Sequence, residues 1–123
     1  MHPFRRAIEA EDIDGALALL AEDVCFHSPI VFKPYLGREA VTPLLSAVAR
    51  VFEDFRYVRE IGAAGAADHA LVFEARIGTR ELQGCDFLHI NEDGLIDDFF
   101  VMVRPLSAAL ALAEAMRAQL AGT

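Results

Sequence analysis

The chain has 123 residues, 54% of them hydrophobic, and its 19 acidic and 11 basic side chains give a formal net charge of −8. This composition excludes a disordered chain and predicts one folded domain over residues 1–123. Acidic charge without a basic stripe argues against a nucleic-acid partner, and no apolar run is long enough to cross a membrane. Because the first residues do not form a secretory signal, we expect a cytoplasmic protein without a membrane partner.

The first third of the chain predicts two helices, a short strand and a loop. An early proline favours a helix over Pro3–Ala10, and Asp12 is placed to cap a second helix over Ile13–Ala21. The alternative is one bent helix over both segments. Asp23–Ser28 alternates as a strand, and the Ile30–Gly37 loop is apolar enough to cover another part of the molecule. The strand has two faces: Val24, Phe26 and Ser28 on one, Cys25 and His27 on the other.

The next predicted element is a helix over Arg38–Asp54, in which Pro43 allows two starting points. A start at Arg38 places Pro43 inside the helix, where a backbone hydrogen bond is lost. A start after a Thr42 cap places Pro43 in the first turn, where proline is favoured. We favour the Arg38 start because of the resemblance described below.

Four strands and a last helix complete the predicted order. The strands are Phe55–Ile61, His69–Ile77, Leu82–Asn91 and Leu95–Arg104, and the helix is Ser107–Leu120 with Ser107 as its cap and Gly122 beyond its end. The apolar side of this helix is expected to be Leu106, Leu110, Ala113 and Leu120. The last strand is apolar on both faces from Phe99 onward, which indicates a central strand or a contact between copies of the chain.

Asp86 is the clearest candidate for a functional residue. It lies on the strand before a tight turn at Asn91–Gly94, on the face that otherwise carries Leu82, Gly84, Leu88 and Ile90. A buried carboxylate loses its hydration, so its pKa rises unless a cation or a hydrogen-bond donor compensates. We therefore expect either a raised pKa or one clear partner, with Tyr57, Arg59 and Arg76 as candidates.

The element order resembles the nuclear transport factor 2-like superfamily, and within it the SnoaL-like proteins related to polyketide cyclases and steroid isomerases. The matching segments are Asp12–Leu17, Ala21–Val24, Ser28–Pro29, Gly37–Val41 and Asp93–Ile96. The resemblance implies an α+β cone, in which a strongly curved, mainly antiparallel sheet wraps around N-terminal helices over a deep pocket. The helix over 107–121 is an extension of this domain. Dimers through the convex face of the sheet are frequent in such proteins.

The resemblance also implies which positions carry chemistry. In the steroid isomerases of this superfamily, a base aspartate precedes the proline that ends the first strand, and here that position is Ser28. The oxyanion-hole tyrosine on the first helix corresponds to Phe4, whereas the second acid of that oxyanion hole corresponds to Asp86. SnoaL-type cyclases use an aspartate on the last strands, for which Asp97 or Asp98 is a candidate.

These observations give one set of catalytic candidates, namely Asp86, His27 and Asp97. Alternation directs His27 toward the convex face unless the Pro29 break turns it inward, and it places Asp97 with Phe99 near the pocket mouth. The candidate substrate-binding residues are Phe4, Phe26, Ser28, Tyr57, Phe73, Leu88, Phe99 and Val101.

The spacing of histidines and cysteines predicts no metal, and the absence of a glycine-rich phosphate loop predicts no cofactor. Two functions remain. The first is a cofactor-free acid/base enzyme, of the isomerase, cyclase or hydratase/hydrolase type, that acts on a small, largely apolar molecule. The second is a non-catalytic ligand-binding or dimerisation module. Convergence of Asp86 with His27 or Asp97 in one pocket would favour the enzyme. A homodimer is expected in either case.

Overall fold

The computed structural model describes residues 1–121, so the predicted helix stop at Gly122 lies outside the described range. Its elements follow one another as α1 (Pro3–Glu9), α2 (Ile13–Leu17), β1 (Leu20–His27), β2 (Tyr35–Leu36), α3 (Arg38–Val51), β3 (Glu53–Ile61), β4 (Asp68–Ile77), β5 (Arg80–Ile90), β6 (Ile96–Arg104) and α4 (Leu106–Ala121). None of the helices within these residues is long and apolar enough to span a membrane.

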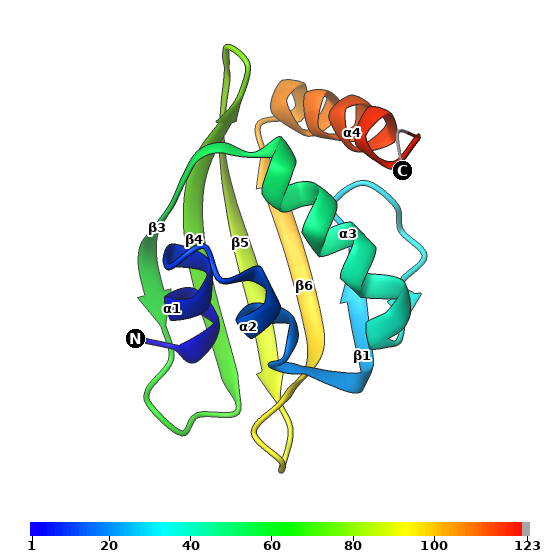
Figure 1. Cartoon of the computed structure of the whole chain (residues 1–123). Coiled ribbons are helices and arrows are strands. Elements are labelled where there is room, and N and C mark those ends of the chain that lie inside the picture. Colours follow the sequence, from blue (N-terminus) through cyan, green and yellow to red (C-terminus); the bar gives the residue numbers. More distant parts are fainter. Residues whose placement is uncertain (122–123) are drawn as a thin grey trace.

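The strands form one sheet in the order β2-β1-β6-β5-β4-β3, and neighbouring strands are antiparallel except for the parallel pair β1 and β6. Figure 1 shows α1 and α2 in front of the sheet and α3 beside them, all on one face. We call this the concave face and the opposite one the convex face. The predicted α+β architecture, with N-terminal helices against a mainly antiparallel sheet, is confirmed.

The hairpin of β5 and β6 forms as its sequence predicts. Gly94 has φ +78, and the Asn91 side-chain oxygen accepts hydrogen bonds from the backbone N–H groups of Asp93 and Leu95, both at 2.9 Å. Side chains along β5 then point alternately to the two faces of the sheet, so one face of the strand is buried and the other is more exposed. The buried positions are Leu82, Gly84, Asp86 and Leu88.

Pro43 lies inside α3, which begins at Arg38 as favoured above. The hydroxyl of Thr42 donates a 2.8 Å hydrogen bond to the carbonyl of Arg38 in the first turn, so Thr42 does not act as the cap. Gly37 occupies the cap position with φ +94, a value that glycine adopts without steric cost.

Several boundaries differ from the prediction by a few residues, and the contacts at two of them show why. The second helix ends at Leu17 instead of Ala21, because β1 begins at Leu20 and pairs there with Ile96 of β6. The backbone N–H of Ile96 donates to Leu19 at 2.8 Å, so a long-range strand contact overrides the local helical pattern. The last helix begins at Leu106, where the carbonyl of Pro105 accepts its first backbone bond, and Ser107 is already inside it.

The buried side of α4 differs in part from the predicted one, although Ala113 and Leu120 are half-buried and line the cavity. Leu106 and Leu110 are exposed, whereas Ala108 and Leu112 are buried. Apolar residues occur almost all the way round this helix. Their positions, and the size of the side chains, therefore do not indicate which side of the helix is buried. The small Ala108 allows a close approach to the core next to Leu112, whereas Leu106 and Leu110 lie outside.

Candidate functional site

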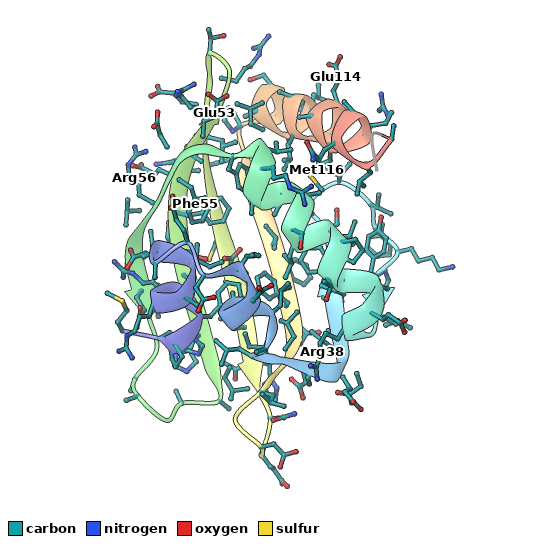
Figure 2. The ribbon with its side chains drawn as sticks, in the orientation of Figure 1. Arg38, Glu53, Phe55, Arg56, Glu114 and Met116 are labelled. Atoms are coloured by element: carbon teal, nitrogen blue, oxygen red, sulfur yellow. The ribbon has the colours of Figure 1, made fainter. Side chains whose placement is uncertain are left out.

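A cavity of about 1280 Å³ lies between the concave face of the sheet and the helices. All four helices and strands β1 to β6 contribute to its lining, together with the loop that follows β1. Figure 2 shows Phe55 on β3 and Met116 on α4, two lining residues that come from the middle and from the C-terminal part of the chain. The cavity is therefore a product of the whole fold.

Two groups of aromatic rings form much of the apolar wall. Phe52, Phe55 and Phe73 contact one another, with ring centroids 4.9 to 5.6 Å apart, and Tyr57 meets Phe55 edge-on at 5.0 Å. In the second group Phe99 contacts Phe4 at 5.2 Å and Phe26 at 5.4 Å. Such edge-on and offset contacts fix the rings, so the wall is pre-formed.

Gly84 makes room for the ring at the centre of this wall. Phe73 on β4 lies directly across from Gly84 on β5, and its ring covers the position where a side chain would stand. A Cβ on Gly84 would be 2.2 Å from the Cζ of Phe73. The glycine in the buried face of β5 therefore permits an aromatic residue to line the cavity.

Asp86 carries the only buried carboxylate within residues 1–121, with 6% of the residue exposed, and it lines the cavity. The hydroxyl of Tyr57 donates a hydrogen bond of 2.8 Å to its Oδ2. Burial raises the pKa of Asp86 from 3.8 to about 7, although the Tyr57 hydrogen bond lowers it. This carboxyl is therefore present in both protonation states near neutral pH, as an acid/base group must be.

Tyr57 is the partner of Asp86, and the two arginines proposed as alternatives are not. Arg76 pairs with Glu53 and Asp54 at 2.7 Å, and Arg59 has an exposed side chain. Burial raises the pKa of Tyr57 well above its usual value, and the charge of Asp86 adds to the effect. Tyr57 therefore remains a hydrogen-bond donor throughout the physiological range.

Of the residues predicted to bind a substrate, all but Leu88 line the cavity. Leu88 is 2% exposed and belongs to the core beneath it. Ser28 reaches the cavity, but its hydroxyl accepts hydrogen bonds from the backbone N–H groups of Ile30 and Val31 at 2.9 and 3.2 Å. These bonds hold the apolar loop, whose Ile30 and Val31 also line the cavity.

The structure does not bring His27 or Asp97 to Asp86. His27 follows the alternation of β1 onto the convex face, where its ring stacks on Phe100 at 4.8 Å. Asp97 was expected at the pocket mouth, and this expectation is wrong. His89 pairs with Asp98 and Ile90 with Ile96, so Asp97 is an extra residue in β6. Such a bulge reverses the alternation locally, and Asp97 bonds to His89 Nδ1 at 2.7 Å.

Several lining residues were not singled out from the sequence. They lie on α3, on the segment that joins it to β3, and on α4: Leu44, Leu45, Val48, Phe52, Phe55, Leu112 and Met116. The apolar spacing of α3 predicts an inward face but not a cavity beneath it. For α4, no pattern in the sequence indicates that the helix closes one end of the cavity.

The protein is an α+β domain with a buried carboxyl group at the wall of an aromatic cavity. Comparisons with known proteins identify the family to which such a domain belongs. A family model described as SnoaL-like domain matches residues 2–99. The chain therefore belongs to the SnoaL-like family, as the resemblance implied. A search of curated proteins found no match.

Solved structures support the same assignment. A Pseudomonas aeruginosa structure named steroid delta-isomerase shares 44% identity over 95% of this chain and 85% of its own, with a TM-score of 0.89. An uncharacterised Silicibacter pomeroyi protein with a cystatin-like fold shares 39% identity over 97% and 86%, with a TM-score of 0.88. A Mycobacterium tuberculosis protein in complex with estradiol-17β-hemisuccinate shares the fold at 21% identity over 86% and 91%, with a TM-score of 0.65.

Proposed function

We propose that the cavity binds a small, largely apolar molecule and that Asp86 promotes a proton transfer on it without a cofactor. The observation that carries this proposal is the Asp86–Tyr57 pair, buried at the wall of an aromatic cavity. Tyr57 occupies Oδ2 of Asp86, which leaves Oδ1 to donate a proton or a hydrogen bond to an oxygen of the substrate. A protonated carboxyl in an apolar site is an effective donor to developing negative charge.

Relatives support the class of substrate. A structure named steroid delta-isomerase shares 44% identity with this chain, and a more distant member of the fold holds a steroid derivative. A cavity of about 1280 Å³ has room for a molecule of that size. We therefore propose an apolar, ring-containing ketone as the substrate class and isomerisation through an enol as the reaction type.

Binding without turnover is the second candidate function, and the surroundings of Ser28 favour it. The position that carries the base in the steroid isomerases is a serine, whose hydroxyl is already bonded to two backbone N–H groups. The other carboxylates that line the cavity, on Glu9, Glu11, Asp14 and Asp54, belong to exposed residues. An enzyme would use one of these or water as the base, whereas a binding module needs none.

Replacing the proposed acid separates the two functions. In Asp86→Asn the shape and the Tyr57 contact remain, but the proton is lost. Deuterium uptake next to the ketone, followed by NMR on a panel of steroid-like ketones, is expected to slow about 100- to 1,000-fold. Asp23→Asn, an exposed control on β1, should match the wild type. Unchanged exchange in Asp86→Asn would refute the catalytic role, and ligand binding without any exchange would establish the binding module.

We also propose that the chain forms a homodimer through its convex face. Phe87 and Met102 are 42% and 55% exposed on neighbouring strands, and Phe100 lies between them in contact with Phe87. Light scattering at micromolar concentration should give twice the chain mass of 13.5 kDa. Met102→Glu should shift the mass toward the monomer, whereas Val58→Glu on the edge strand β3 should not. A wild-type mass near 13.5 kDa would contradict the dimer.

A further inference from the structure

Three side chains of metal-ligating type meet on the convex face, outside the cavity. Cys25 and His27 are two residues apart on β1 and therefore share a face, and the parallel pairing with β6 places Asp98 directly beside Cys25. The Sγ of Cys25 lies 3.5 Å from Nε2 of His27, and the same nitrogen lies 2.9 Å from Oδ1 of Asp98. All three atoms lie within 4.8 Å of one another.

Two groups converge on one nitrogen, and a hydrogen bond engages only one of them at a time. Nε2 carries either one hydrogen or one lone pair. If it carries the hydrogen, it donates to the nearer Asp98 oxygen, and the thiol of Cys25 has no hydrogen bond to the imidazole. If it carries the lone pair, it accepts from the thiol and faces the negative carboxylate at 2.9 Å. A cation in contact with all three atoms would engage them at the same time.

We propose that Cys25, His27 and Asp98 form a binding site for a divalent transition-metal ion, with zinc the best match. Thiolate, imidazole and carboxylate are the ligand types that zinc takes. A tetrahedral zinc site with usual bond lengths separates its ligand atoms by roughly 3.3–3.6 Å. The 3.5 Å distance from sulfur to nitrogen has this value already, and the 2.9 Å distance needs to open by a few tenths of an ångström. The distance from sulfur to the carboxylate oxygen is within 4.8 Å and has to close to the same range when the ion binds.

The surroundings suit a site with three protein ligands and one open position. Phe100 stacks on the His27 ring with an interplanar angle of 28° and holds its orientation. In the single chain the side chains of His27 and Asp98 are 28% and 45% exposed, so water can reach the fourth position.

The test uses the full chain, reduced and freed of metal, with zinc and cobalt ions as probes. Competition with a chromogenic chelator should give one zinc ion per chain, and cobalt should give a thiolate charge-transfer band. In Cys25→Ser the band should disappear and the zinc affinity should fall more than about 100-fold, since a direct ligand contributes more than the outer partners whose loss costs about 10- to 100-fold. Asp98→Asn should weaken zinc binding while the thiolate band remains.

The matched control is Cys85→Ser, which removes the other cysteine and should keep both the stoichiometry and the band. Met102→Glu should also bind zinc normally, because all three ligands belong to one chain. Circular dichroism checks the fold of each variant. Because Cys25→Ser and Asp98→Asn change different ligands, a folding defect in one of them leaves the other as a test. Absence of zinc binding by the wild type, equal affinity in Cys25→Ser, or loss of binding in Met102→Glu would overturn the proposal.

Discussion

Raising the pH from about 4 to about 8 is expected to lower the free energy of unfolding by up to about 4 kcal/mol through Asp86 alone. Its pKa rises from 3.8 to about 7 on folding, so the folded protein holds this proton more tightly than the unfolded chain does. Between these two values the folded state binds more protons, and stability falls as the pH rises. The stabilisation is fully present below the unfolded pKa and is lost as the pH passes the folded one.

Urea unfolding at a series of pH values measures this effect, and Asp86→Asn isolates it. The asparagine is neutral at every pH, so the variant should lack this slope and exceed the wild type in stability at pH 8. Asp23→Asn, which replaces an exposed carboxylate on β1, should retain the slope of the wild type. Parallel curves for Asp86→Asn and the wild type would show that the carboxyl keeps an ordinary pKa.

Gly84→Ala is expected to destabilise the fold by about 1–3 kcal/mol, the usual range for forcing extra volume into a packed core. The new Cβ would lie 2.2 Å from the ring of Phe73, which is 1% exposed and contacts Phe52, Phe55 and Tyr57. These aromatic contacts hold the ring, so a shift away from the new Cβ displaces other rings of the cavity wall. Thermal or urea unfolding measures the loss directly.

The double variant Gly84→Ala/Phe73→Leu distinguishes this cause from a general intolerance of alanine on β5. Leucine ends short of the outer ring atoms, so the two changes together should cost less than the sum of their separate effects. Glu81→Ala, at an exposed position of the same strand, should change the free energy of unfolding by no more than about 0.5 kcal/mol. Additive effects of the two changes would contradict a clash between these residues.

Features set by local alternation were predictable from the sequence. The inward direction of Asp86 follows from a period of two along β5 and from the turn at Gly94. The sequence also contains the Cys25-x-His27 spacing that puts both side chains on one face. It does not show that β1 runs beside β6, which is what brings Asp98 to them.

The remaining differences come from tertiary contacts that no short pattern contains. The extra residue at Asp97 leaves no mark in the sequence of β6, yet it takes the Asp97 side chain to His89 instead of to the cavity. Tyr57 bonds to Asp86 across the intervening strand β4, a contact that depends on the sheet order. The early end of the second helix and the buried side of α4 likewise depend on what each segment packs against.

Because every helix and strands β1 to β6 contribute to the cavity lining, occupancy of the cavity and folding of the domain are thermodynamically linked. A ligand that requires the assembled wall binds the folded chain and not the unfolded one. At 100 times its dissociation constant, such a ligand adds about 2.7 kcal/mol to the free energy of unfolding. A melting-temperature screen of compound libraries therefore reports on this cavity directly, and it does so without any knowledge of the reaction.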